Sequence, residues 1–206
     1  MNISVKDYID SFINDINNEI NWKYLKSSRK LKKQISDMVF EINFYSSKYN
    51  GVDSHVEIRS ECRVWCKKYD KSLTIKSSIA IISFLTNKEY WWDITGEENR
   101  KAILQLLLQE INAKVISFTS EMEVDFDNGL LNLIYNHGFS AHSNSIQLLD
   151  ALLGREEASK AANEYAKAFT QAEQNMIKHF VSGECDLVNE KNLRYMIDNH
   201  LINPAL

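Results

Sequence analysis

The chain has 206 residues, 44% of them hydrophobic and 25% charged, a balance that excludes a disordered protein. Its formal charge of -4 is unevenly distributed. Residues 1–76 carry 14 Lys and Arg against 10 Asp and Glu, whereas residues 77–206 carry 10 against 18. Such an asymmetry arises either from a partner-binding surface or from ordinary solvated faces, and the sequence leaves both interpretations open.

Features of secreted and membrane proteins are missing from the sequence. No stretch approaches the roughly 20 apolar residues of a membrane-spanning helix. The first residues, MNISVKDYIDSF, lack the basic segment and apolar run of a secretion signal. We therefore expect a cytoplasmic protein without a membrane partner. Cys62 and Cys66 would stand about 13 Å apart on a strand, which is too far for a disulfide, so we expect free thiols.

The first half of the chain alternates between helical and strand patterns. Apolar residues at spacings of three and four predict an amphipathic helix over residues 5–20, with Ser4 as its N-cap. Alternating residues predict a half-buried strand over residues 38–45 and, after a turn, a second strand over residues 58–67. Residues 73–85 are apolar on both faces and predict a central strand covered on both sides.

A long helix is expected after these strands. Residues 90–94 predict a short edge strand, and Thr95 with Glu98 three residues later has the spacing of a capping box. Helical periodicity then continues to about residue 119. We expect this helix to lie across the sheet.

The remaining residues show only helical patterns. Two short helices are predicted to end near Gly138 and Gly154, and a last helix covers residues 189–201. Residues 155–180 are rich in Ala, Glu, Lys and Gln and predict one long helix. Its stripe of alanines suits a helical hairpin or a contact between copies in a homo-oligomer.

Together these patterns predict the fold class α+β. Residues 1–119 are expected to form an α+β domain with an N-terminal helix, a three- to four-stranded antiparallel sheet and a covering helix. Residues 120–206 are expected to form an all-helical C-terminal extension packed on that domain. The single Pro and the small number of Gly residues agree with a mostly helical chain.

Ligands for a metal or a catalytic centre do not gather in the sequence. The His residues are scattered, and no HExxH motif or paired cysteine spacing is present. Residues 121–129 alternate like a calcium loop, but Asn128 stands where that loop needs Gly and Ile134 where it needs Glu. We therefore expect no catalytic residue, metal or cofactor, and hence no enzyme. An enzyme would need a pocket in which a His or Cys meets a carboxylate.

A basic segment covers residues 22–33. Its cations could contact phosphates, with Trp22 and Tyr24 offering stacking faces, so nucleic-acid or phosphate-ligand binding is one hypothesis. Against it stand the general richness of the chain in Lys and a pI of about 5.8. The pattern fits a helix and a strand equally well. The candidate phosphate-binding residues are Lys23, Lys26, Arg29, Lys30, Lys32 and Lys33.

Three tryptophans are candidates for contact with a protein partner. Trp91 and Trp92 are adjacent on an extended segment, so they point to opposite sides and one of them is expected in the core. Trp65 lies on the polar face of its predicted strand. An exposed Trp is a favoured anchor in protein interfaces.

The run WKYLKSSRKLKK from Trp22, Phe40-Glu41-Ile42 and the turn SSKYN resemble an uncharacterised bacterial α+β domain family of unknown function. The resemblance covers residues 12–118. Related domains occur near polymorphic toxin systems, where many small proteins are immunity factors. The resemblance implies a bacterial, non-enzymatic protein that binds another protein, and it carries over no functional residue.

The leading hypothesis from the sequence is therefore a protein-binding domain, in its sharpest form a toxin-neutralising immunity protein. It would use either the acidic helical half or the aromatic-bearing face of the sheet. An acidic surface would suit a basic toxin such as a nuclease, because complementary charge speeds encounter.

Overall fold

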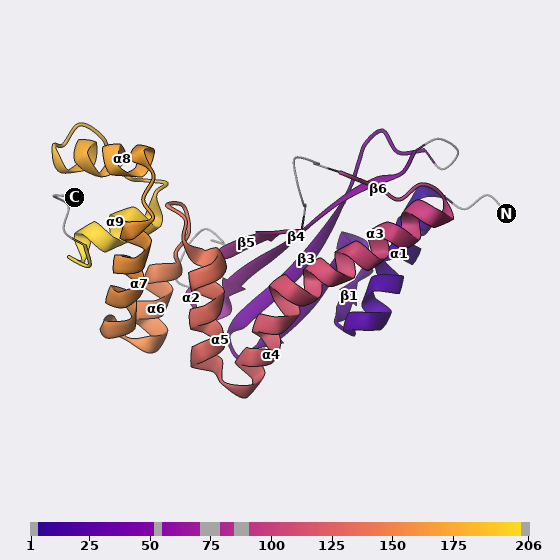
Figure 1. Cartoon of the computed structure of the whole chain (residues 1–206), viewed down its shortest axis with the longest axis horizontal. Coiled ribbons are helices and arrows are strands. Elements are labelled where there is room, and N and C mark those ends of the chain that lie inside the picture. The colour runs from indigo at the N-terminus through magenta and orange to yellow at the C-terminus, as the bar shows by residue number, and fades with distance from the viewer. Residues whose placement is uncertain (1–3, 52–54, 71–78, 85–90, 203–206) are drawn as a thin grey trace.

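The computed structural model describes residues 4–51, 55–70, 79–84 and 91–202 and shows an α+β protein (Figure 1). As the sequence predicts, an N-terminal helix precedes an antiparallel sheet and a helical C-terminal part. The strands are β1 (Lys23–Leu25), β2 (Lys30–Ile35), β3 (Met38–Ser46), β4 (Glu57–Cys66), β5 (Ala80–Ser83) and β6 (Trp92–Asp93). The helices before the C-terminal part are α1 (Val5–Ile20), η1 (Lys26–Ser28), α2 (Lys67–Asp70), α3 (Gly96–Ile111), η2 (Asn112–Ile116) and α4 (Ser117–Val124).

The basic segment adds two strands to the predicted sheet. It forms β1, the short turn η1 and β2, so the strand interpretation of residues 22–33 is the right one. Arg29 adopts the left-handed conformation at the end of η1 and lets the chain reverse into β2. In the described residues the sheet has the order β1-β2-β3-β4-β5, with β6 also paired to β4.

The prediction of the central strand is wrong. Within residues 73–85 the structure describes 79–84. There β5 is a short strand that, among the described residues, pairs with β4 alone and leaves Ile81 56% exposed. The central strand is β3, which was predicted to be half-buried but is buried on both faces from Met38 to Phe44. Its second face is covered because β2 and β4 carry long side chains on either side.

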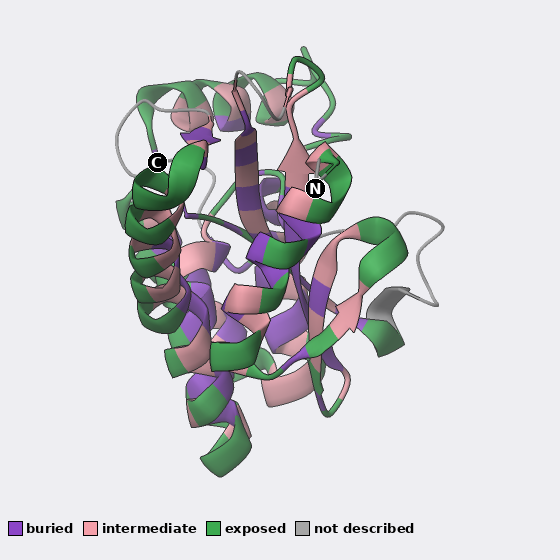
Figure 2. Cartoon of the chain, turned by 90° about the vertical axis from the view of Figure 1, so that its right-hand side faces the viewer, coloured by how far each residue is buried: buried purple, intermediate pink, exposed green. Residues whose placement is uncertain are grey.

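The core lies between one face of this sheet and the helices. Helix α1 begins at the predicted residue, where the Ser4 hydroxyl accepts the Asp7 amide at 3.1 Å, and it buries Ile9, Phe12 and Ile13. Helix α3 crosses in front of the strands beside α1 (Figure 1). Figure 2 shows buried residues gathered where helices and strands meet, with exposed residues on the outer turns of the helices.

Helix α3 starts at the predicted place without the predicted capping box. The Thr95 hydroxyl accepts the Val56 amide at 2.7 Å instead of capping the helix, and the Thr95 amide donates to Asp93 at 2.8 Å. The side chain that could cap the helix therefore joins it to the start of β4. Helical structure continues through η2 and α4 to Val124, so the predicted boundary after residue 119 falls inside a continuous helical run.

The C-terminal part consists of short helices. These are α5 (Phe126–Leu133), η3 (Ile134–Gly138), α6 (Ser145–Leu153), α7 (Arg155–Lys167), α8 (Gln171–Val181) and α9 (Lys191–Asp198). The predictions of helix ends at Gly138 and Gly154 are confirmed. Ala158, Ala161 and Ala162 are buried where α7 packs on α6, so the alanine stripe is used within the chain in a helical hairpin.

The single long helix predicted over residues 155–180 is wrong. The chain leaves the helix at Ala168 and starts a new one at Thr170, because Thr170 and Glu173 form a complete capping box. The Thr170 hydroxyl accepts the Glu173 amide at 3.2 Å, and the Glu173 carboxylate accepts the Thr170 amide at 2.8 Å. The Thr-x-x-Glu spacing of a capping box is present in the sequence, but the strong helix formers on both sides of it favour a continuous helix.

We expect Thr170→Ala to lower the free energy of unfolding by about 1 kcal/mol, because the first turn of α8 loses its side-chain acceptor. Urea unfolding followed by circular dichroism measures the change. Thr170→Ser keeps the hydroxyl and is the matched control, expected to stay close to the parent. Equal stability of all three proteins would show that the capping box does not hold the start of α8.

Candidate functional site

The second face of the sheet carries four of the predicted site residues, namely Lys23, Lys30, Lys32 and Trp65. The strand register places alternate residues of β1 to β5 on the side opposite the core helices. Val39 agrees with this assignment. Its side chain is fully buried, yet it does not belong to the hydrophobic cluster that packs between the sheet and the helices. In Figure 1 this side is turned away from the viewer, behind α3 and the strands. We call it the open face; it comprises Lys23, Leu25, Lys30, Lys32, Gln34, Val39, Glu41, Asn43, Tyr45, Glu57, Arg59, Glu61, Arg63, Trp65, Ile81 and Ser83.

Glu41 is the centre of one ion cluster on the open face. It lies on the central strand and is almost buried, with 8% of its surface exposed. Lys30 and Lys32 of the neighbouring strand reach its two oxygens at 3.0 and 3.3 Å. A buried carboxylate needs such partners, since an isolated charge would be costly to bury.

Glu61 is the centre of a second cluster. Its carboxylate accepts the Tyr45 hydroxyl at 2.9 Å and the Arg63 Nε at 2.8 Å, and Arg59 lies 3.5 Å away. Burial and the hydrogen bond to Glu61 raise the pKa of Tyr45, so the phenol stays protonated and donates. The four charged and polar groups are therefore held in one connected network.

Both aromatic rings of the open face lie beside cations. The Lys32 ammonium lies 5.7 Å from the centre of the Trp65 ring, and the Arg59 guanidinium lies 5.0 Å from the centre of the Tyr45 ring. Such cation–π contacts orient long side chains over the sheet. The sheet face is consequently ordered before any partner arrives.

The basic segment is divided by the fold. Lys23, Lys30 and Lys32 lie on the open face. Arg29 is instead directed to α1, where its Nε lies 3.3 Å from buried Asp10, and Lys33 pairs with Glu123 of α4 at 2.8 Å.

Asp10 also accepts the hydroxyl of Tyr24, the aromatic residue of the segment that was a candidate for stacking. Burial and the Asp10 carboxylate raise the pKa of Tyr24 to about 12. Lys26 lies in η1, away from the strand positions. The six candidate cations thus form no common phosphate-binding surface.

The tryptophans also separate. Trp65 lies on the open face, partly exposed. Trp92 pairs with Ile58 and is 2% exposed, so it belongs to the core and its candidacy as a partner anchor is wrong. Trp91, its neighbour, is partly exposed and precedes β6, which pairs with the first residues of β4. The expectation that one member of the pair lies in the core is confirmed.

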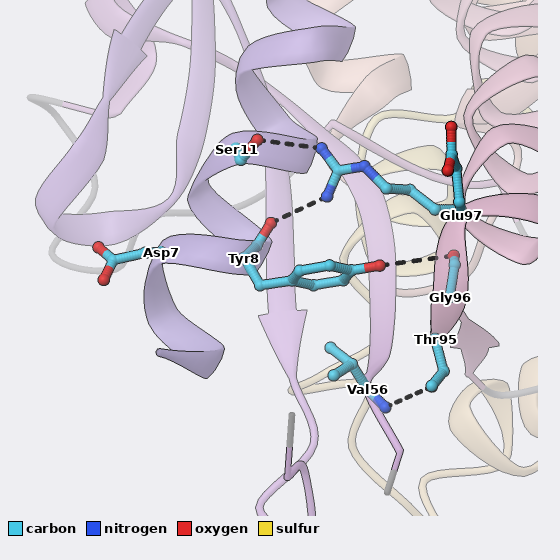
Figure 3. Close-up of a pocket in the computed structure, with 8 residues that line it drawn as sticks. Asp7, Tyr8, Ser11, Val56, Thr95, Gly96 and Glu97 are labelled. Atoms are coloured by element: carbon cyan, nitrogen blue, oxygen red, sulfur yellow. Dashed lines mark hydrogen bonds between the residues drawn. The ribbon is translucent and has the colours of Figure 1, made fainter. Parts of the chain in front are cut away.

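A hollow of about 620 Å³ lies between the first turns of α1 and α3 (Figure 3). Several of its polar groups join the two helices or the segment between β6 and α3. Arg100 donates to the Tyr8 carbonyl at 3.2 Å and to Ser11 at 3.1 Å, and it pairs with Asp15. The Tyr8 hydroxyl donates to the Ile94 carbonyl at 2.8 Å. These contacts fasten α1 to α3 and point to no ligand.

A smaller hollow of about 290 Å³ lies between β5 and the C-terminal helices. His137 lines it and forms a T-shaped ring pair with Phe118, with ring centres 5.4 Å apart. Burial and nearby Lys114 lower the pKa of this imidazole. Ser143, also in the lining, donates to the Gly138 carbonyl at 2.7 Å. His142, also in the lining, contacts the Asn189 carbonyl and lies close enough to Glu173 to help lower the pKa of that carboxyl. Among the described residues, no hydrogen bond or ion pair joins His137 or His142 to a carboxylate side chain, the direct pairing that an acid–base enzyme would need.

Neither the cysteines nor the possible metal ligands indicate a reactive or metal-binding site in the described residues. The three cysteines are free, and burial strongly raises the pKa of Cys62, which disfavours a reactive thiolate. Among the residues that the structure describes, no three His, Cys, Asp or Glu side chains gather to hold a metal ion. Asp125 of the calcium-like run accepts the Asn128 amide and caps α5.

The open face is therefore the feature of this α+β protein with the most functional character. No protein-family model matches the chain, and no curated protein or solved structure matches it either. Over the described residues, no helix is long and apolar enough to cross a bilayer.

Proposed function

We propose that the chain is a non-enzymatic protein-binding domain and that the open face of the sheet is its binding surface. The observation that supports this most is the concentration of Trp65, Tyr45, Arg59 and Arg63 on one partly exposed face. Trp, Tyr and Arg are the residues that most often dominate binding energy in protein interfaces. Their preordered network would lower the entropy cost of association.

The toxin-neutralising role is the finer form of this proposal and draws on the resemblance to the immunity-associated family. In that role the open face would cover a surface that the toxin needs for its activity. The acidic helical half is the weaker candidate for the same contact. Its carboxylates are largely engaged within the chain, as where Lys160 pairs with Glu156 and Glu157 and where Glu173 caps α8.

Nucleic-acid binding is the second candidate, and the presence of Lys23, Lys30 and Lys32 beside Trp65 favours it. One observation weighs against it. Cations already lie beside the Trp65 and Tyr45 rings that would stack on bases. Binding to nucleic acid would also weaken steeply with added salt.

Affinity purification of the tagged protein at near-physiological salt, with and without nuclease, tests the proposal. We expect a stoichiometric protein partner that survives nuclease and is retained on the order of tenfold less by Trp65→Ser, the loss typical of an interface hot spot. Tyr49→Ser, which changes a 77% exposed aromatic outside the open face, is the matched control and should retain the partner. Circular dichroism of each variant verifies the fold.

Two results would contradict the proposal. Loss of the captured material on nuclease treatment would favour nucleic-acid binding. If the parent, Trp65→Ser and Tyr49→Ser all capture the same amount of partner, the binding surface is not the open face.

A further inference from the structure

The charges of the open face are layered by depth. The side chains of Glu41 and Glu61 are 11% and 13% exposed, whereas those of the four cations that surround them are 30–48% exposed. The carboxylates therefore lie at the floor of the face and the cations rise above them. Those four cations are Lys30, Lys32, Arg59 and Arg63.

This layering leaves the outer surface positive. Each carboxylate is bracketed by two cations, so one positive charge in each cluster exceeds what the carboxylate neutralises. Lys23, which pairs with Lys32 across β1 and β2, adds a third positive charge at the same surface. The chain as a whole is negative at -4, so this local excess is not a consequence of overall composition.

The positive area has a boundary. At the β6 end of the sheet, Glu57 lies opposite Asp93, and His55 lies 3.0 Å from the Glu57 carboxylate. Acidic groups thus replace basic ones at the first residue of β4 and on the neighbouring β6. The cationic area covers β1 to β4, with Trp65 and exposed Ile81 beside it.

We infer that the partner of the open face is a protein that presents an acidic segment to it. This inference rests on the proposed function and specifies its partner. Carboxylates of the partner would meet the exposed outer side of the cations, which lie above Glu41 and Glu61, while an apolar side chain would meet Trp65 and Ile81. Complementary charge would speed encounter and disfavour basic partners.

Binding of a short poly-L-glutamate peptide, followed by NMR shifts of the backbone amides, tests the charge preference directly. We expect shifts concentrated in β2, β3 and β4, and an affinity that falls with added salt because exposed charges are screened. The double variant Lys32→Gln with Arg63→Gln should weaken binding on the order of tenfold. Neutral substitutions avoid placing new carboxylates beside Glu41 and Glu61, and circular dichroism verifies the fold.

The matched control is Lys101→Gln with Lys178→Gln, which removes the same charge from exposed positions on α3 and α8. It should leave the affinity close to that of the parent. Equal weakening by both double variants, or shifts spread over the whole chain, would overturn the inference because only net charge would then matter. Tighter binding of a single-stranded RNA oligonucleotide at the same amides would also overturn it.

Affinity purification with the same variants separates this inference from the proposed function. If Trp65→Ser loses the partner but Lys32→Gln with Arg63→Gln keeps it, the open face binds a protein and the acidic character of that protein is refuted. If neither variant loses the partner, the proposed function itself fails. Loss with both variants and retention by the Lys101 and Lys178 control supports both.

Discussion

Replacing Gly129 with Ala is expected to destabilise the protein by about 1–3 kcal/mol, the usual cost of overpacking. Gly129 is buried in α5 at its crossing with α4. A Cβ atom there would lie 2.6 Å from the Met122 backbone nitrogen and 2.9 Å from its Cα. The Met122 Cγ would also lie 2.6 Å away, but because backbone atoms are among the obstacles, a change of side-chain rotamer is not enough and α4 and α5 would have to separate.

The expected loss of stability is opposite in direction to the usual effect of replacing Gly with Ala in a helix. In an ordinary helix interior, Ala is more favourable than Gly by roughly 1 kcal/mol. Urea unfolding of Gly129→Ala should nevertheless show a lower midpoint. Gln105→Ala, at an exposed position of α3, is the control and is expected within about 0.5 kcal/mol of the parent. An unchanged or higher midpoint for Gly129→Ala would mean that the two helices tolerate the added methyl group.

The sequence could not have identified Gly129. The acidic pattern of residues 121–129 suggests only a failed calcium loop, whereas the requirement for glycine comes from the close approach of two helices.

Local sequence patterns predict structure best where no distant residue competes for the same hydrogen-bonding groups. Helix α1, with Ser4 as its cap, and the helix end at Gly154 are of this kind.

The two Thr-x-x-Glu sequences show what the local signal omits. At Thr95 and Glu98 the capping box was predicted and does not form, because the Val56 amide, 39 residues away in the chain, takes the Thr95 hydroxyl. At Thr170 and Glu173 it was overlooked and does form. The same residues at the same spacing thus have different outcomes, decided by long-range contacts.

The open face was only partly predictable for the same reason. Alternation along β4 placed Trp65 on a polar face, and the basic segment was recognised as ambiguous between helix and strand. Which of its cations share a surface depends on the register of β2 against β3, which no local pattern specifies. Glu41 and Glu61, which hold the cations in place, were not candidates at all.

Replacing Asn192 with Ala is expected to cost roughly 3 kcal/mol, because it strands several buried polar groups. Asn192 is completely buried in α9. Its amide nitrogen lies 2.8 Å from the Ser140 carbonyl and 2.6 Å from the Ser143 hydroxyl, and its amide oxygen accepts the Ile146 backbone N–H at 3.1 Å. The side chain therefore connects α9 to the start of α6.

The loss follows from the burial of the partners that Asn192 leaves behind. In a helix start the first backbone N–H groups lack intrahelical acceptors, so Ile146 depends on the Asn192 oxygen. Asn163→Ala removes an exposed amide that contacts only the Ser159 carbonyl of its own helix in the described contacts, and it should cost less than about 0.5 kcal/mol. Urea unfolding distinguishes the two. A cost for Asn192→Ala no larger than that for Asn163→Ala would show that water replaces the lost amide and that the junction is not as closed as its burial indicates.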